Sequence, residues 1–221
     1  MSLQLLDRDL GVVDHALSVG GLALGTRTTV VRRADGGVIV LSPGPLADAD
    51  AAAIAALGPV LAVVAPNLMH HRFLAAACAR FADARLYAPA ALAKKQPALP
   101  IAGAPAAVAC ETLHAIDVGG MPGLQETLFV HTSSRTLIAT DLVFNLRAPA
   151  PWLTRLFMGL NGGFDRFGPT RICRRLCKDR AAVRTAVDRA LAEPFDRVVV
   201  AHGQLLPSGG REALRAGFAW L

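Results

Sequence analysis

The chain contains 221 residues, of which 53% are hydrophobic, and it carries a formal net charge of +6 at pH 7. A chain of this length and composition can bury a substantial core, which excludes a disordered or low-complexity protein. The modest positive charge is compatible with an anionic substrate, but no basic, aromatic-rich stretch of a nucleic-acid-binding module accompanies it. The four cysteines show neither a CxxC pair nor a disulfide-scaffold spacing, which indicates core thiols.

Two stretches bear on the cellular compartment. Residues 1–9 lack the basic start and apolar core of a signal peptide, so we expect a cytoplasmic protein. Residues 51–69 contain no charged side chain and are long enough for a membrane span. Gly58 and Pro59 divide this stretch and Pro66 follows, which predicts a helix and a buried strand instead. No membrane partner is therefore expected.

Strand-like runs and Ala-rich helical stretches alternate in the first half of the chain. The predicted strands lie at 10–14, 28–33, 38–42, 61–65 and 85–88, and the predicted helices at 48–57, 73–81 and 89–95. The turn signal at 34–37 joins two of these strands as a hairpin. Residues 97–105 hold three prolines and are expected to form a loop.

The second half repeats this alternation around one basic segment. It predicts one or two strands within 108–118, a hairpin of strands at 127–131 and 136–140, a helix at 179–192, a strand at 197–201 and a closing helix at 209–221. No internal repeat or linker interrupts the pattern. We therefore expect a single domain over residues 1–221.

The basic segment at 147–180 differs in character from the rest of the chain. It holds eight basic and two acidic residues. Its large apolar side chains recur at helical spacing and could cover the site, mediate a dimer or fill the core, which is the default expectation: Trp152, Leu153, Leu156, Phe157 and Leu160. Three arginines are weak candidates for binding an anionic substrate, with a solvated helix face as the alternative: Arg171, Arg174 and Arg175.

Three predicted strands end in side chains that can bind a metal. These junctions place His70 and His71 after the strand at 61–65, Asp141 after that at 136–140, and His202 after that at 197–201. Ligands bind at the carboxyl ends of strands in α/β sheets, so these side chains are expected to meet. Imidazole nitrogens and a carboxylate oxygen suit zinc, iron or manganese.

The order of elements, the Thr-Asp pair at 140–141 and the His-Gly pair at 202–203 resemble the metallo-β-lactamase superfamily. The resemblance extends from about residue 9 to residue 221. The pattern Ala-Pro-Asn-x-x-His-His at 65–71 is similar to a bacterial branch with a degenerate metal motif. The resemblance implies an α/β protein of the metallo-β-lactamase-like kind, a four-layer αββα sandwich.

The metal signature of that superfamily, His-x-His-x-Asp-His, is only partly kept at 66–71. Pro66 and Leu68 replace its first two histidines, and the matching loop at 121–125 also lacks its histidine. The second metal position of the family uses four residues, whose counterparts here can all bind a metal: His70 (in place of the aspartate), His71, Asp141 and His202. The resemblance therefore implies one mononuclear site.

Such a site implies a metal-dependent hydrolase, with Asp141 as a ligand and also as general base. Zinc is the first choice of metal, with iron or manganese as alternatives. Four protein ligands would close a tetrahedral zinc. Either the metal takes a fifth ligand, or one of the four, with His70 the candidate, does not touch it.

The competing hypothesis is a catalytically inactive protein that keeps the fold as a binding or interaction module, with its site empty or holding a structural ion. A nucleic-acid-processing relative is disfavoured, because the two-metal centre of such nucleases is absent. The expected partner is a small-molecule substrate, for which an anionic group is one option. Nucleic acid is not expected as a partner, and homodimer formation is left open.

Overall fold

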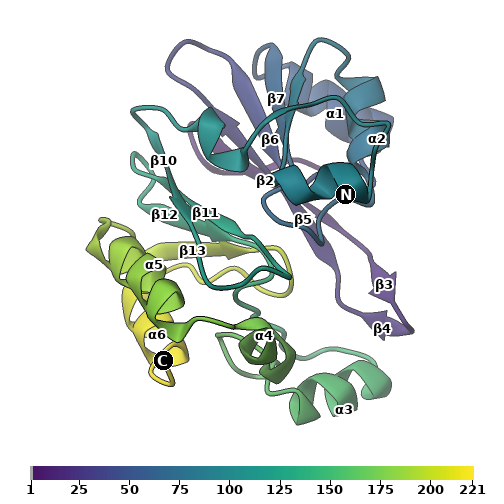
Figure 1. The fold of residues 1–221 in the computed structure, drawn as a ribbon. Helices are drawn as coiled ribbons and strands as arrows, with labels where there is room; N and C mark the ends of the chain where they lie inside the picture. Colours follow the sequence, from purple (N-terminus) through teal and green to yellow (C-terminus); the bar gives the residue numbers. More distant parts are fainter. Residues whose placement is uncertain (1) are drawn as a thin grey trace.

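The computed structural model describes residues 2–221 and shows two β-sheets packed face to face, with helices on both outer faces (Figure 1). The first sheet has the strand order β1-β2-β5-β6-β7-β8-β9 and the second has the order β10-β11-β12-β13. A separate two-stranded hairpin is formed by β3 and β4. This is the mixed α/β, four-layer arrangement that the sequence predicts.

The strands of the first sheet are β1 (Gln4–Asp7), β2 (Leu10–His15), β5 (Thr26–Arg32), β6 (Val38–Leu41), β7 (Val60–Val64), β8 (Arg85–Tyr87) and β9 (Ile101–Gly103). The second sheet consists of β10 (Leu113–Asp117), β11 (Thr127–His131), β12 (Thr136–Ala139) and β13 (Arg197–Val200). The small hairpin consists of β3 (Ser18–Val19) and β4 (Leu22–Ala23).

The helices are α1 (Asp48–Ala55), α2 (Leu74–Arg80), α3 (Trp152–Leu160), α4 (Arg171–Leu176), α5 (Arg180–Ala192) and α6 (Gly210–Gly217), with 3-10 turns η1 (Ala90–Lys94) and η2 (Pro105–Val108). Two of them, α4 and α5, begin at capping side chains. Asp179 accepts a hydrogen bond from the Ala182 amide at 3.0 Å, and Thr170 accepts one from the Cys173 amide at 3.1 Å. Each cap satisfies an amide that has no partner within its helix.

Successive side chains of the central strands point to opposite faces of each sheet, and they divide the core into three parts. In β7, Val63 packs toward α1 and α2, whereas Val64 packs toward the second sheet. In β13, Val199 packs between the sheets, whereas Val198 and Val200 pack toward α5 and α6. Both faces of these strands are buried, which explains why they are continuous apolar runs.

Arg27 of β5 ties the first sheet to the end of β13. This residue is 6% exposed, and its guanidinium donates hydrogen bonds to the carbonyl of Val200 and, at 3.0 Å, to that of Gly203. Its Nε pairs with the Asp14 carboxylate at 2.6 Å. The link fixes the path of the chain after β13, because Val200 lies two residues before His202 and Gly203 follows it directly.

Two expectations about local structure were wrong. The Pro-rich stretch at 97–105 is not entirely a loop, because Ile101–Gly103 pairs with β8 as the edge strand β9. The helix expected at 89–95 is a 3-10 turn, Ala90–Lys94. Both segments are short, and tertiary contacts override weak local preferences in such segments.

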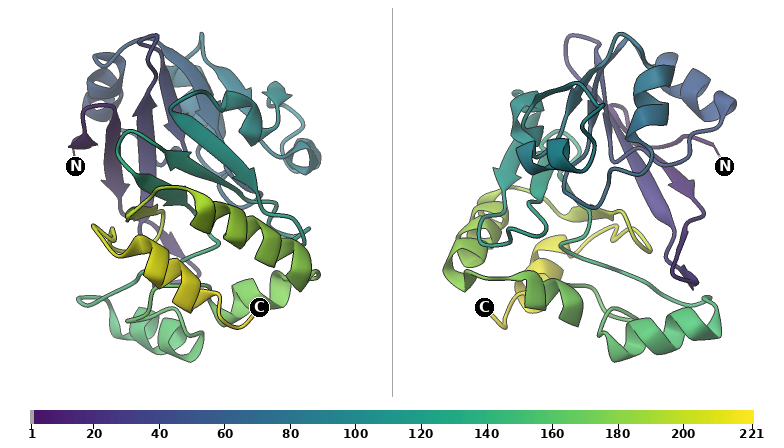
Figure 2. Two further views of the ribbon diagram at one scale, coloured as in Figure 1. Left: turned by 90° about the vertical axis from the view of Figure 1, so that its left-hand side faces the viewer. Right: turned by 45° about the vertical axis from the view of Figure 1, so that its right-hand side comes forward.

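The expectation that the apolar side chains of α3 fill the core was also wrong. Trp152 is 73% exposed and Leu160 67% exposed. Helix α3 lies at the end of the molecule farthest from α1 and α2, as both views in Figure 2 show. Among residues 2–221, no helix has the length and hydropathy needed to cross a membrane.

Candidate metal centre

The loop after β7 begins with a turn that is organised by Asn67. The Asn67 Oδ1 accepts hydrogen bonds from the amides of Met69 at 2.8 Å and His70 at 3.0 Å. Such Asx turns use the side chain to replace a backbone acceptor. The Leu68 amide donates to the Leu124 carbonyl at 3.0 Å, which joins the loop to the segment before β11. His70 is therefore held in a fixed place between the two sheets.

Three of the four predicted ligands come together at the ends of the strands. His70, Asp141 and His202 each present one ligand-type atom, and these atoms all lie within 4.8 Å of one another. The His70 Nε2 lies 3.1 Å from Asp141 Oδ2, and the His202 Nε2 lies 3.4 Å from Asp141 Oδ1. Two imidazoles and one carboxylate thus face a common point.

Hydrogen bonds to the far nitrogens orient both rings. The His202 Nδ1 lies 2.7 Å from the Gly25 carbonyl, which can only accept, so Nδ1 carries the proton. The Nε2 atom of the same ring is thereby directed at the Asp141 carboxylate. The His70 Nδ1 lies 2.6 Å from the Ser42 hydroxyl. Fixing the far nitrogen in this way is the usual support for a metal-binding histidine.

Charges within the cluster favour a cation. Burial would raise the pKa of Asp141, but His70 and His202 hold it well below its usual range. Burial opposes protonation of His70, yet the Asp141 carboxylate raises the pKa of that ring above its usual value. The carboxylate is therefore ionised, and its negative charge faces the Nε2 atoms of both rings. The donor set fits zinc, iron or manganese.

His71 is not part of this group in the portion of the chain that the structure describes. Its Nδ1 lies 2.9 Å from the Leu68 carbonyl, so the ring turns back on its own loop. The histidine outside the cluster is thus His71, whereas the sequence analysis named His70 as the candidate that does not touch the metal. Three protein ligands leave one position open on a tetrahedral metal, which is the pattern of catalytic zinc sites.

The buried side of Asp141 is held by two residues to which sequence reasoning gave no role, Asn67 and Glu126. The Asn67 Nδ2 lies 2.8 Å from Asp141 Oδ2 and 3.1 Å from Glu126 Oε2. The Glu126 carboxylate accepts hydrogen bonds from three successive amides, those of Thr140 at 2.7 Å and of Asp141 and Leu142 at 2.9 Å each. Burial and the neighbouring Asp141 raise the pKa of Glu126.

Only weak signals could have identified this pair. Asn67 lies between two apolar residues at a strand end, where a polar side chain needs a partner. Glu126 has no local signal, because its partners are 14 to 59 residues away in sequence.

A cavity of about 280 Å³ is lined by the cluster of His70, Asp141 and His202. Its walls are largely apolar and include Leu17, Val19 and Leu24 from the β3–β4 hairpin region, together with Met69 and Phe73. His70, Asp141 and His202 supply its polar lining, and Arg72 is the cation beside them. The arginines that the sequence suggested for substrate binding do not line it: Arg171, Arg174 and Arg175.

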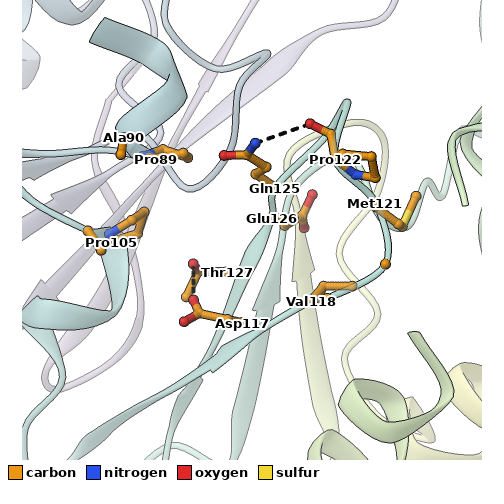
Figure 3. Close-up of a pocket in the computed structure, with 13 residues that line it drawn as sticks. Pro89, Ala90, Pro105, Asp117, Val118, Met121, Pro122, Gln125, Glu126 and Thr127 are labelled. Atoms are coloured by element: carbon orange, nitrogen blue, oxygen red, sulfur yellow. Dashed lines mark hydrogen bonds between the residues drawn. The ribbon is translucent and has the colours of Figure 1, made fainter. Parts of the chain in front are cut away.

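A second cavity, of about 370 Å³, lies on the other side of Glu126 (Figure 3). Pro89 and Pro105 face it from one side, and Met121 and Pro122 from the other. Its polar groups are already engaged, because Thr127 donates to Asp117 at 2.6 Å and Gln125 donates to the Pro122 carbonyl at 3.2 Å. Without a cluster of ligand-type atoms, this cavity is the poorer candidate for chemistry.

No protein-family model matches the sequence, and no curated protein is significantly similar to it. Solved structures nevertheless share the fold over nearly the whole chain. A metallo-β-lactamase from Hirschia baltica is 12% identical with a TM-score of 0.67, covering 99% of this chain and 96% of its own. One from Erythrobacter litoralis is 14% identical with the same TM-score and the same coverage.

A third similar structure is the metallo-β-lactamase FIM-1 from Pseudomonas aeruginosa, solved in a mono-zinc form. It is 12% identical with a TM-score of 0.63, covering 99% of this chain and 93% of its own. At such low identity the likeness concerns the fold alone. The chain has the metallo-β-lactamase fold that its sequence predicted, with a group of histidine and aspartate side chains suited to a metal.

Proposed function

We propose that the protein is a hydrolase that uses one divalent metal ion, zinc first, held by His70, Asp141 and His202. The observation that carries the proposal is the convergence of three ligand atoms within 4.8 Å beside a cavity of about 280 Å³. The fold shared with metallo-β-lactamases, one of them solved in a mono-zinc form, supports the same reading. A single metal also agrees with Pro66 and Leu68, which cannot act as ligands.

A divalent metal at this place would acidify water and polarise the carbonyl or phosphoryl group of a substrate. The chain itself supplies orientation. The Gly25 carbonyl and the Ser42 hydroxyl fix the two rings, and Asn67 fixes one oxygen of Asp141. Asp141 is the only carboxylate lining the cavity within the described residues, so it is also the residue to accept a proton.

The cavity walls restrict the substrate class. Five apolar side chains line the space beside the cluster: Leu17, Val19, Leu24, Met69 and Phe73. They would exclude water from the reacting bond, which strengthens the electrostatic interactions there. Arg72 would pair with an anionic group of the substrate. An apolar ester, amide or phosphoester with one negative charge therefore suits this cavity.

Metal analysis tests the proposal directly. Protein purified without a histidine tag is analysed by plasma mass spectrometry, alongside Asp141→Asn, His202→Ala and the control His114→Ala. His114 is exposed and pairs with Glu193 outside the site. We expect about one metal ion per chain in the wild type and in the control, and at least about a hundredfold weaker binding in the two site variants, because losing a supporting residue alone costs 10–100-fold.

A screen with chromogenic esters, lactams and phosphodiesters follows for the loaded protein. If the wild type stays empty after incubation with zinc, iron and manganese, the hydrolase proposal fails. The fold would then serve as a binding module, which is the competing hypothesis.

A further inference from the structure

Helix α3 exposes its apolar face to solvent. Trp152, Leu153, Leu156, Phe157 and Leu160 are 73%, 40%, 54%, 41% and 67% exposed. Their spacing places them on one side of the helix. The opposite side, with Thr154 and Met158, is buried. The helix is therefore turned outward relative to the usual arrangement for a surface helix of a globular protein.

Contacts on the buried side hold α3 in this orientation. The Thr154 hydroxyl accepts a hydrogen bond from the Ala23 amide of β4 at 2.9 Å. After the last turn, the Asn161 side chain accepts one from the Ile172 amide at 3.0 Å. Rotating α3 to bury its apolar side would break both anchors and expose Met158. The outward orientation is thus built into the fold.

Two exposed apolar residues on neighbouring elements extend the apolar face of α3. Val19 of β3 is 51% exposed and belongs to the hairpin whose other strand, β4, donates to Thr154. Ile172 of α4 is 49% exposed, and its amide donates to Asn161 after the end of α3. We call the whole set the α3 face: Val19, Trp152, Leu153, Leu156, Phe157, Leu160 and Ile172. Seven of the ten exposed large hydrophobic residues in the described chain belong to it. A concentration of this kind marks an interaction surface.

Charge decides which kind of partner covers the α3 face. Arg155 lies on the helix itself, and Arg166, Arg171 and Arg175 are exposed in the segment that follows, against a single exposed acid, Asp165, between positions 151 and 178. A symmetric contact with a second copy would bring these like charges together, which is unfavourable. An anionic lipid surface accepts both the cations and the apolar side chains.

The shape of this region agrees with a lipid partner. Helix α3 and the β3–β4 hairpin lie at one end of the molecule, outside the sandwich (Figures 1 and 2). Trp152 at the start of the helix is of the type that is enriched at membrane–water interfaces. We propose that α3 lies in the headgroup region of an anionic membrane, with its apolar face inserted and the neighbouring arginines on the lipid phosphates. This departs from the sequence-based expectation of no membrane partner.

Vesicle flotation tests the proposal and does not depend on any metal. The full chain is mixed with phosphatidylglycerol–phosphatidylcholine vesicles or with pure phosphatidylcholine vesicles. We expect binding to the anionic vesicles that weakens with added salt. Leu156→Ser/Phe157→Ser should bind at least about tenfold more weakly, since two apolar side chains are lost from the interface. Leu5→Ser/Leu61→Ser removes two exposed leucines elsewhere and should bind like the wild type.

A fluorescence readout places the contact at α3. In a Trp220→Phe background, Trp152 is the only tryptophan, and its emission should shift to the blue on anionic vesicles and be quenched by brominated lipid. Absence of vesicle binding, or equal binding by the two double variants, overturns the proposal. A dimer in sedimentation analysis that Leu156→Ser/Phe157→Ser dissociates would assign the face to a second copy and also overturn it.

Discussion

The two sides of Asp141 are built for different purposes. Toward the cavity, its oxygens face the Nε2 atoms of His70 and His202, which can bind a metal or carry a proton. Toward the interior, Asn67 and Glu126 form a closed network in which every carboxylate oxygen has a donor. Because the closed side keeps the strand ends in place, a ligand could bind to the open side and leave it without moving them.

The closed side also connects two loops of the chain. The loop after β7 and the loop at 121–125, where the superfamily signature would place further histidines, lie close together, since the Leu68 amide donates to the Leu124 carbonyl. Asn67 and Glu126 join these two segments through hydrogen bonds. Hydrogen bonds within the protein therefore hold these two segments together.

The largest effect is expected from breaking the closed side. Glu126→Ala leaves the backbone amides of Thr140, Asp141 and Leu142 without their acceptor, whereas the Asn67 side-chain amide keeps Thr140 and Asp141 as acceptors. We expect a loss of about 3–5 kcal/mol in the free energy of unfolding, because each unsatisfied buried donor costs about 1–3 kcal/mol. Urea denaturation followed by circular dichroism measures it. Glu111→Ala, at an exposed glutamate, should stay within about 0.5 kcal/mol of the wild type. Equal stability of the two variants would contradict a structural role for Glu126.

A smaller effect is expected from loosening the open side. Ser42→Ala removes the partner of the His70 Nδ1 and should weaken metal binding about 10–100-fold without unfolding the protein. Competition with a chelator measures the affinity. Ser134→Ala removes a similar contact, that with the His131 Nδ1 at 2.7 Å, and should not change the affinity. If both variants bind equally well, the Ser42 contact does not orient a ligand.

The smallest effect is expected at the histidine outside the cluster. His71→Ala should leave metal affinity unchanged, whereas His70→Ala should abolish binding, because only His70 faces Asp141. The same chelator competition compares the adjacent variants. A comparable loss in both would mean that His71 turns away from Leu68 and joins the site, which restores the four-ligand arrangement expected from the sequence.

The sequence predicted most of the strands and the positions where metal-binding side chains follow them. Apolar runs such as 61–65 and 197–201 are visible because both of their faces are buried. The choice between His70 and His71 could not be predicted, because it depends on the turn around the Asn67 side chain. The role of Glu126 was also out of reach, since it depends on hydrogen bonds to β12 and the residues after it. The outward orientation of α3 is set by its contacts with Ala23 and Ile172, which have no sequence signature.

The contacts of the Arg27 guanidinium affect how the protein unfolds. It spans from the first sheet to the carbonyls on both sides of His202, while His70 reaches the same place from the loop after β7. The two sheets therefore cannot separate, even locally, without exposing a buried cation and dispersing the ligands. The site should be among the last regions to exchange its amide hydrogens, and the cluster should be lost in the same cooperative step as the core between the sheets.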